Sequence, residues 1–335
     1  MGNRGDEKSK RSFGEMKKKK LKKVLGVIVG AVVVLAIGGS VAMGGYVSDR
    51  ILYQNRDNDT IGNSVKQLAT WGYDLEGFYK KYTGEDISVE AEDGNMVPAS
   101  YFNNGSDKCV VLVHGAGGDR ACTYPLAEAY LDRGFDIIAL DQRGSGVNPD
   151  PKVTFGIHEQ RDVKALVKYA REELGKDKVI VHGQSMGGMT TALYASNATP
   201  GDTGAADAVI CDSPVPGMEA FLRLMFGDGP EGAYSGMSNY LIAVTKPYMK
   251  LAHGIDFAEG DTIELVKNDK LPTMVIVSDK DEVCLPEMVE EVYENVGSDT
   301  KTEVHVDSAH IEGIIDDKDY YMQQVRAFLE PIGLY

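Results

Sequence analysis

The pentapeptide Gly183-Gln184-Ser185-Met186-Gly187 places a serine between an apolar run, residues 179–181, and a helix-like segment, residues 189–197. This is the pattern G-x-S-x-G at a strand-to-helix turn, where a sharp bend exposes the serine hydroxyl. The amino-terminal end of the following helix favours the negative charge that develops during attack on a carbonyl. The motif and its context predict that Ser185 is a nucleophile. The alternative is a serine in a tight turn without catalysis.

A nucleophilic serine needs a base, which an acid orients. The chain has six histidines, and His310 lies in the segment DSAHIEG, directly after the last predicted strand. Loops at that edge of a parallel sheet are where ligands bind. His182, which precedes the serine turn, and His305, which lies inside the last strand, are predicted to be structural. His310 is therefore the predicted base.

The acid is expected after the preceding strand, where VIVSDKDEVCLP contains two aspartates. Asp281 is the preferred candidate because it lies further into the loop, and Asp279 is the alternative. Both could also be ordinary solvated turn carboxylates. The chain order Ser185, Asp281, His310 matches the serine, aspartate, histidine order of one hydrolase architecture and differs from the two protease orders.

A glycine-rich loop, VLVHGAGGD at residues 111–119, follows the first long predicted strand. Glycines let a backbone approach a substrate oxygen closely. We expect the backbone N–H groups of Ala116 and Met186 to form the oxyanion hole. A phosphate-binding loop is excluded here, because neither the G-x-G-x-x-G spacing nor a P-loop lysine is present.

Short, continuously apolar segments alternate with helix-like segments through the rest of the chain. Such runs are typical of strands that are covered on both faces, as in a parallel α/β sheet. Before them, residues 87–102 alternate apolar and polar side chains around Asp93-Gly94-Asn95, which predicts an antiparallel hairpin. The predicted strands of the parallel part are residues 109–113, 136–140, 178–181, 208–211, 273–277 and 302–306. The predicted helices are residues 126–133, 160–174, 187–197, 287–295 and 320–329.

The interval between Asp212 and Leu271 is far longer than the dozen or so residues that a crossover connection requires. Its apolar spacing is helical, which predicts a cap inserted over the sheet at about residues 214–268. Apolar cap side chains would either contact an acyl or aromatic group of a substrate or simply pack on the core. They include Phe221, Leu224, Met225, Phe226 and Leu241.

Residues 24–47 contain no charged side chain. As a helix these 24 residues reach about 36 Å, enough to cross a hydrocarbon core of about 30 Å. The lysine cluster at residues 17–23 predicts that residues 1–23 are a cytoplasmic tail and that the body lies outside the cytoplasm. The alternative is a secreted protein, released when a signal peptide is cleaved near residues 40–42.

Residues 48–85 are expected to be a linker and a docking helix, and residues 86–335 a hydrolase domain. The first 23 residues hold ten Lys/Arg and three Asp/Glu, so the remainder has 25 basic against 48 acidic residues, or about −23. That charge argues against nucleic-acid binding. The four cysteines lack metal-ligand spacing, although a disulfide between Cys122 and Cys284 is one alternative for them.

Together, five segments resemble the α/β-hydrolase superfamily, in its serine aminopeptidase-like or lysophospholipase-like branch. They are HGAGG, DQRGSG at residues 141–146, GQSMGG, SDKDEV and the His310 loop. The resemblance extends over about residues 87–329. It implies an eight-stranded, mostly parallel sheet, a triad of Ser185, Asp281 and His310, and a cap after the sixth strand.

These observations predict a membrane-bound serine hydrolase that cleaves an acyl bond through an acyl-enzyme, with a carboxylic ester as the first choice. The expected substrate is a small molecule or a lipid-like ester, and no metal or organic cofactor is expected. The alternatives are an aminopeptidase or amidase with the same triad, and a catalytically silent surface module with a hydrolase fold that binds a ligand.

Overall fold

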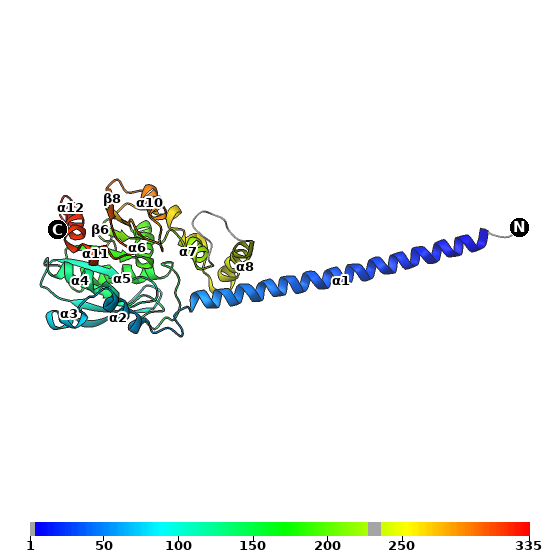
Figure 1. The fold of residues 1–335 in the computed structure, drawn as a ribbon, viewed down its shortest axis with the longest axis horizontal. Helices are drawn as coiled ribbons and strands as arrows, with labels where there is room; N and C mark the ends of the chain where they lie inside the picture. The colour runs from blue at the N-terminus through cyan, green and yellow to red at the C-terminus, as the bar shows by residue number, and fades with distance from the viewer. Residues whose placement is uncertain (1–3, 227–235) are drawn as a thin grey trace.

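The computed structural model describes residues 4–226 and 236–335. A body built on one sheet carries a single long helix, α1 (Arg4–Leu52), which extends away from it toward the amino terminus (Figure 1). Within the described residues, this is the one helix that is long and apolar enough to cross a membrane, by length and composition. The side chains of residues 24–39 are all exposed, whereas Val47, Ile51 and Leu52 are buried against the body.

The sheet has eight strands in the order β1-β2-β4-β3-β5-β6-β7-β8. Strand β2 pairs antiparallel with β1 and β4, and every other pairing is parallel. The predicted fold, with its amino-terminal hairpin, is thereby confirmed. The strands are β1 (Glu85–Glu90), β2 (Met96–Phe102), β3 (Lys108–Val113), β4 (Asp136–Leu140), β5 (Lys178–Gln184), β6 (Ala208–Asp212), β7 (Thr273–Ser278) and β8 (Lys301–Val306).

Helices cover both faces of the sheet (Figure 1). The interior strands β3 to β7 are almost wholly buried, which explains why their sequences are continuously apolar. One apolar core lies under α4 (Tyr124–Leu131) and α12 (Lys318–Leu329). The opposite face packs against α5 (Glu159–Glu172), α6 (Met186–Asn197) and α10 (Pro286–Asn295). A 3₁₀ turn (Arg120–Thr123) and α11 (Gly313–Asp316) complete the loops of the sheet edge.

Two short helices, α2 (Thr60–Thr70) and α3 (Leu75–Lys81), follow α1. Asp59 and Asp74 cap them by accepting hydrogen bonds from backbone N–H groups in the first turn. The ring of Phe78 stacks on Tyr124 with centroids 4.7 Å apart, so α3 is held by aromatic packing on α4. The first residues of the predicted linker, 48–52, are helical and continue α1.

Between β6 and β7 lie α7 (Met218–Met225), α8 (Gly236–His253), α9 (Thr262–Leu265) and 3₁₀ turns at Phe257–Gly260 and Val266–Asn268. This is the position of the predicted cap, of which residues 227–235 lie outside the described residues. Phe221 packs on Phe155, and Phe226 and Leu241 pack on the same apolar cluster. Packing therefore accounts for those three side chains, whereas Met225 is 51% exposed. The side chain of Leu224 lies outside the described part.

Candidate active site

Ser185 is the single residue between β5 and α6, and its backbone has φ 57° and ψ −121°. A non-glycine residue with positive φ is sterically strained and is held there by its surroundings. A Cβ atom at Gly187 would lie 2.1 Å from the carbonyl oxygen of Val113, and one at Gly183 would lie 2.1 Å from the oxygen of Gly187. Both glycines are therefore required by the close approach of β3, β5 and α6, which forces the bend that carries Ser185.

The three predicted triad residues lie within hydrogen-bonding distance of one another. His310 Nε2 is 2.8 Å from Ser185 Oγ, and His310 Nδ1 is 2.6 Å from Asp281 Oδ2. The other oxygen of Asp281 accepts hydrogen bonds from the backbone N–H groups of Val283 and Cys284, both at 2.8 Å. The side chain of Asp281 is fully buried and that of His310 is 19% exposed. The carboxylate thus holds the imidazole with its second nitrogen directed at the serine.

The alternative acid, Asp279, lies elsewhere. Its Oδ1 is 2.7 Å from His305 Nδ1, and both side chains are 44% exposed. The contact with Asp279 raises the pKa of His305 above its ordinary value, more than burial lowers it. The described structure therefore contains two histidine–aspartate pairs, and one of them contacts Ser185.

The loop after β3 approaches the serine closely. A Cβ atom at Gly115 would lie 3.2 Å from the Cβ of Ser185. Ala116, next in the loop, is exposed, and Met186 is the first residue of α6. The first N–H groups of a helix have no partner within the helix, so the Met186 N–H is available to a ligand. Both predicted oxyanion donors therefore lie in segments that border Ser185.

His114 ties this loop to its neighbours. Its Nε2 accepts a hydrogen bond from the backbone N–H of Gln142, so the Nδ1 carries the proton and donates to the carbonyl of Gly115 at 2.6 Å. Burial lowers the pKa of His114, which favours this neutral form. The amide of Gln142 bonds to the His114 carbonyl and to the hydroxyl of Thr190 on α6. Sequence reasoning missed this role, although His114 directly precedes the glycine-rich segment.

Helix α2 supports the same loop from outside. Asn63 donates to the carbonyl of Gly117 at 3.1 Å, and the hydroxyl of Ser64 accepts from the N–H of Asp119 at 2.8 Å. Trp71, at the end of α2, donates through its ring nitrogen to Glu312, two residues after His310. The segment predicted only to dock on the body therefore contacts two loops of the site.

A buried carboxylate, Asp212 at the end of β6, joins three backbone segments. Gln184 donates to Asp212 Oδ2 at 2.9 Å and also approaches the carbonyl of Ile311 at 3.4 Å. The backbone carbonyl of Asp212 accepts the N–H of Ser185 at 2.8 Å. Ser213 and Ile311, like Ser185, have positive φ values, 45° and 55°. Asp212 and Gln184 therefore connect the backbone segments that contain Ser185, Ser213 and Ile311, all of which have positive φ.

His182 lies in the core between two tyrosines, one of which also contacts Asp212. The hydroxyl of Tyr321 donates to Asp212 Oδ2 at 2.8 Å, so it accepts from His182 Nε2 at 3.0 Å, and Tyr130 donates to His182 Nδ1 at 3.0 Å. Burial lowers the pKa of His182 to about 3. This histidine is neutral and structural, as its position before the serine turn predicts.

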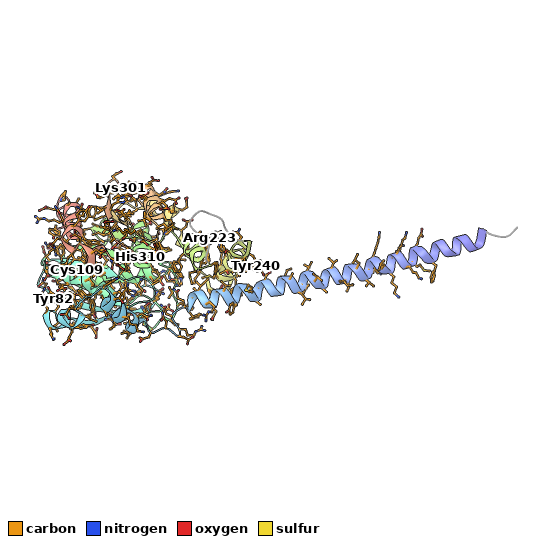
Figure 2. The ribbon with its side chains drawn as sticks, viewed as in Figure 1. Tyr82, Cys109, Arg223, Tyr240, Lys301 and His310 are labelled. Atoms are coloured by element: carbon orange, nitrogen blue, oxygen red, sulfur yellow. The ribbon has the colours of Figure 1, made fainter. Side chains whose placement is uncertain are left out.

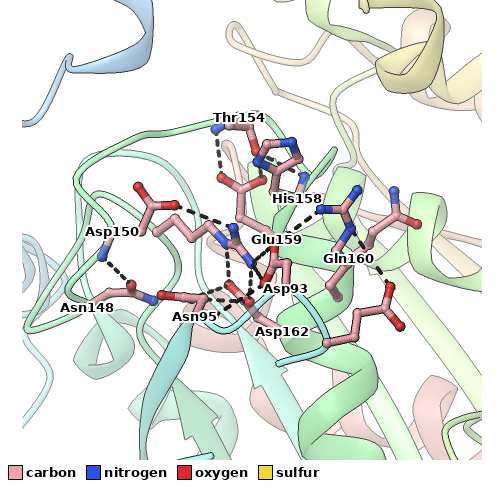
Figure 3. Close-up of polar contacts among 12 residues, drawn as sticks. Asp93, Asn95, Asn148, Asp150, Thr154, His158, Glu159, Gln160 and Asp162 are labelled. Atoms are coloured by element: carbon pink, nitrogen blue, oxygen red, sulfur yellow. Dashed lines mark hydrogen bonds and ion pairs between the residues drawn. The ribbon is translucent and has the colours of Figure 1, made fainter. Parts of the chain in front are cut away.

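The DQRGSG loop after β4 is held by ion pairs at two of its residues, Asp141 and Arg143. Asp141 accepts from Arg120, which keeps its pKa below the ordinary value although burial raises it. Arg143 is 2% exposed and bonds to both oxygens of Asp162 on α5, at 2.7 and 2.9 Å. The same guanidinium pairs with Asp93 of the β1–β2 turn at 2.9 Å. Figure 3 labels the carboxylates of Asp93, Asp150 and Asp162 that surround it. These contacts are structural and lock the loop onto the hairpin and α5.

All four cysteines are buried, free thiols. The Sγ of Cys122 donates to Ser64 Oγ at 3.1 Å and lies 3.1 Å from Gln67 Oε1. The disulfide between Cys122 and Cys284 is therefore not formed. Burial raises the pKa of both thiols. Among the described residues, no cluster of histidine, cysteine, aspartate or glutamate could hold a metal ion.

Comparison with known proteins identifies the fold. The family model of the alpha/beta hydrolase fold matches residues 108–250. An uncharacterized protein of Bacillus subtilis, YqkD, is 21% identical over 92% of this chain and 98% of its own length. The proline iminopeptidase of Saccharolobus solfataricus is 29% identical, over 35% of this chain and 40% of its own length.

Among solved structures, the Pyrococcus furiosus esterase Pf2001 superimposes with a TM-score of 0.61 at 21% sequence identity. The match covers 77% of this chain and 95% of the esterase. At this level of identity, the likeness establishes a shared fold.

Proposed function

We propose that this chain, which has the alpha/beta hydrolase fold, is a serine hydrolase that cleaves carboxylic esters. The observation that carries the proposal is the unbroken series of contacts from Asp281 through His310 to Ser185, at 2.6 and 2.8 Å. Nucleophile, base and orienting acid within hydrogen-bonding reach are the requirement for an activated serine.

In the proposed reaction, Ser185 Oγ attacks the acyl carbonyl while His310 Nε2 takes its proton. The same imidazole then returns the proton to the leaving alcohol, and an ester of Ser185 is formed. Water, deprotonated by His310, hydrolyses this acyl-enzyme and regenerates the serine. Asp281 keeps the imidazole in the required tautomer and stabilises its positive charge.

The N–H groups of Ala116 and Met186 are proposed to stabilise the oxyanion of each tetrahedral intermediate. The strained bend at Ser185 and the close approach of Gly115 support this assignment. Removal of one such donor typically reduces kcat by about 10²–10³. The internal bonds of His114 and Gln142 would hold the loop in place before the substrate arrives.

An ester is the first choice of substrate, because a neighbour of the same fold is an esterase. An aminoacyl amide is the second candidate, which the similarity to a proline iminopeptidase favours. We also propose that α1 anchors the protein in the membrane, with residues 1–23 in the cytoplasm and the body outside. The exposed apolar helix and its lysine cluster support this orientation.

The test of the enzyme is labelling of the full chain, in membranes, by a fluorophosphonate probe. We expect labelling of the unsubstituted protein, loss of labelling in Ser185→Ala, and retention in Ser196→Ala. Ser196 is a suitable control because it lies on α6 and its hydroxyl donates to the carbonyl of Ala192 in the same helix. A folded chain that is never labelled would instead favour a silent binding module.

The choice of bond is tested with 4-nitrophenyl esters of increasing acyl length against aminoacyl 4-nitroanilides. Faster hydrolysis of the anilides would overturn the ester assignment. The orientation is tested by protease treatment of intact cells, where protection of the body would contradict an outside location.

A further inference from the structure

The cap helix α8 lies alongside the last turns of α1, although the two are far apart in sequence. The hydroxyls of Ser40 and Tyr240 are 3.1 Å apart, and Figure 2 shows Tyr240 where the cap meets the long helix. A Cβ atom at Gly44 would lie 2.5 Å from the carbonyl oxygen of Val244. From the first contact to the second, the residue number increases by four in both helices, from 40 to 44 in α1 and from 240 to 244 in α8. The two helices therefore run parallel, with Gly44 beside Val244.

The next contact continues the series. A Cβ atom at Gly45 would lie 3.0 Å from the ring of Tyr248. Glycines on α1 therefore let the two backbones approach closely. The same end of α1 contributes Val47 and Ile51 to the apolar cluster that contains Met249 of α8 and Met186 of the site. Helix α1 is thus packed into the body and is not a loose tether.

The two parallel helices change from uncharged to charged at the same level. In α1, residues 24–48 carry no charge and Asp49 is the first charged side chain; in α8, residues 236–245 carry none and Lys246 is the first. Since Val244 lies level with Gly44, the two changes fall within about one turn of each other. A boundary between hydrocarbon and water accounts for this coincidence in α1 and α8, because charge is costly on its apolar side. The guanidinium of Arg223 on α7 donates to Asn239 of α8 at 3.1 Å, so a neighbouring helix brings charge to this level, which is compatible with the head-group region and not with the hydrocarbon centre.

We propose that the first half of α8, residues 236–245, lies in the membrane interface beside α1 and that the active site takes its acyl substrate from the bilayer. This inference rests on the membrane anchor and the ester hydrolysis proposed above. The occupant of the exposed face of this half-helix is the lipid surface itself.

The depth of α1 in the membrane is estimated by comparing the length of its uncharged run with the thickness of the hydrocarbon core. The uncharged run of 24 residues reaches about 36 Å, about 6 Å more than a hydrocarbon core. With the hydrocarbon core beginning directly after the lysine cluster at residues 17–23, the last residues of the run, from about Gly44, extend into the head-group region. Tyr46 and Tyr248, whose ring lies beside Gly45, are near this level, and tyrosine is enriched at membrane interfaces. Tyr240 contacts Ser40 and lies about one turn deeper. Met237, which precedes them on α8, is 65% exposed and would contact acyl chains.

The second half of α8 has the opposite character. Lys246 pairs with Glu219 of α7 and Lys250 with Asp256, both at 2.5 Å. Leu251 is 88% exposed on this charged half. It therefore offers an internal control, because an apolar residue on the same helix that is even more exposed than Met237 is placed outside the lipid.

The test uses the full-length protein in phospholipid vesicles, with an environment-sensitive fluorophore on single introduced cysteines. The positions are Met237→Cys, Leu251→Cys and, within the span, Val33→Cys. The four native cysteines are buried, and the unsubstituted chain measures their background labelling. Lipids with a quencher on the acyl chain should quench the probes at 33 and 237 severalfold more than the probe at 251.

Each other result has a defined meaning. Quenching at 33 but not at 237 would overturn the proposal and leave the membrane anchor intact. No quenching at 33 would refute the anchor itself. A probe at 237 that is shielded from both lipid and aqueous quenchers, more so at higher protein density, would show that a second copy covers this face and would also overturn the proposal.

The catalytic consequence is tested with Met237→Glu, matched by Leu251→Glu. Met237→Glu should slow hydrolysis of a long-chain acyl ester in vesicles severalfold and leave a soluble short-chain ester unaffected, because only delivery from the bilayer changes. Leu251→Glu should affect neither. Equal rates for all three proteins on the vesicle substrate would contradict delivery through this face. Absence of activity on both esters in the unsubstituted chain would refute the proposed function instead.

Discussion

The two histidine–aspartate pairs at the edge of the sheet have nearly the same contact distance and different surroundings. His310 and Asp281 are 2.6 Å apart and largely or fully buried, whereas His305 and Asp279 are 2.7 Å apart and both 44% exposed. Their aspartates are two residues apart in one loop. Pair geometry alone therefore does not distinguish a catalytic pair from a surface pair.

Burial and the third partner distinguish them. The Asp281 carboxylate is removed from water and accepts two backbone N–H groups as well as His310, so its position is determined on both oxygens. His310 also reaches Ser185, whereas the second nitrogen of His305 faces Glu303 at 3.9 Å. In water-exposed surroundings, an ion pair is screened and contributes little.

The largest expected difference is between His310→Ala and His305→Ala. Loss of the base should reduce kcat on a 4-nitrophenyl ester by on the order of 10⁶. His305→Ala should leave kcat unchanged within the error of the assay, because this side chain does not contact Ser185. Steady-state rates of the two purified variants provide the measurement, with circular dichroism as the control for folding. Similar rates for both variants would remove the distinction drawn here.

A smaller but still large contrast is expected between Asp281→Asn and Asp279→Asn. An amide at position 281 would favour the wrong tautomer of His310 and lower kcat by about 10⁴. Asp279→Asn should retain activity. The ratio of the two kcat values tests the assignment of the acid, and a ratio near unity would leave Asp281 without its proposed role.

The smallest effect concerns stability. The hydrogen bond with Asp279 raises the folded-state pKa of His305 above its ordinary value of 6.5, although partial burial acts in the opposite direction. The pair therefore stabilises the fold fully below pH 6.5, and this contribution is lost as the pH rises through the raised value. Because the pair is exposed, it should amount to less than about 1 kcal/mol.

In Asp279→Asn, the dependence of unfolding free energy on pH should weaken near and above neutrality, as urea titrations of the isolated protein at several pH values would measure. An NMR titration of His305 should show its pKa falling in the variant. An unchanged pKa would mean that the contact with Asp279 does not hold the imidazolium.

Much of the fold could be predicted from local patterns. The continuously apolar runs identify the strands because a parallel sheet is covered on both faces, and the alternating run at residues 87–102 identifies the hairpin. Most of the candidate site could also be predicted from the sequence, because Ser185 lies in a G-x-S-x-G motif and His310 follows the last strand. The structure brings these two together with Asp281, and their catalytic roles remain predictions.

Other features had no local signal. Sequence placed Asp279 and Asp281 in one loop, and only the path of that loop against β8 and the His310 segment directed one inward and the other outward. The supports at His114, Gln142 and Asp212 join segments from different strands. Their hydrogen bonds depend on which strands become neighbours, which no short pattern encodes.

The sequence by itself determined the sheet, the order of the site residues and an uncharged helix long enough for a membrane, because burial and hydrocarbon impose composition on contiguous residues. Only the tertiary structure decided which aspartate meets His310 and that α8 lies beside α1. The contact of Ser40 with Tyr240 joins positions 200 residues apart. Such contacts arise when whole helices and strands pack together. The residues that make them have no sequence motif that identifies their partner.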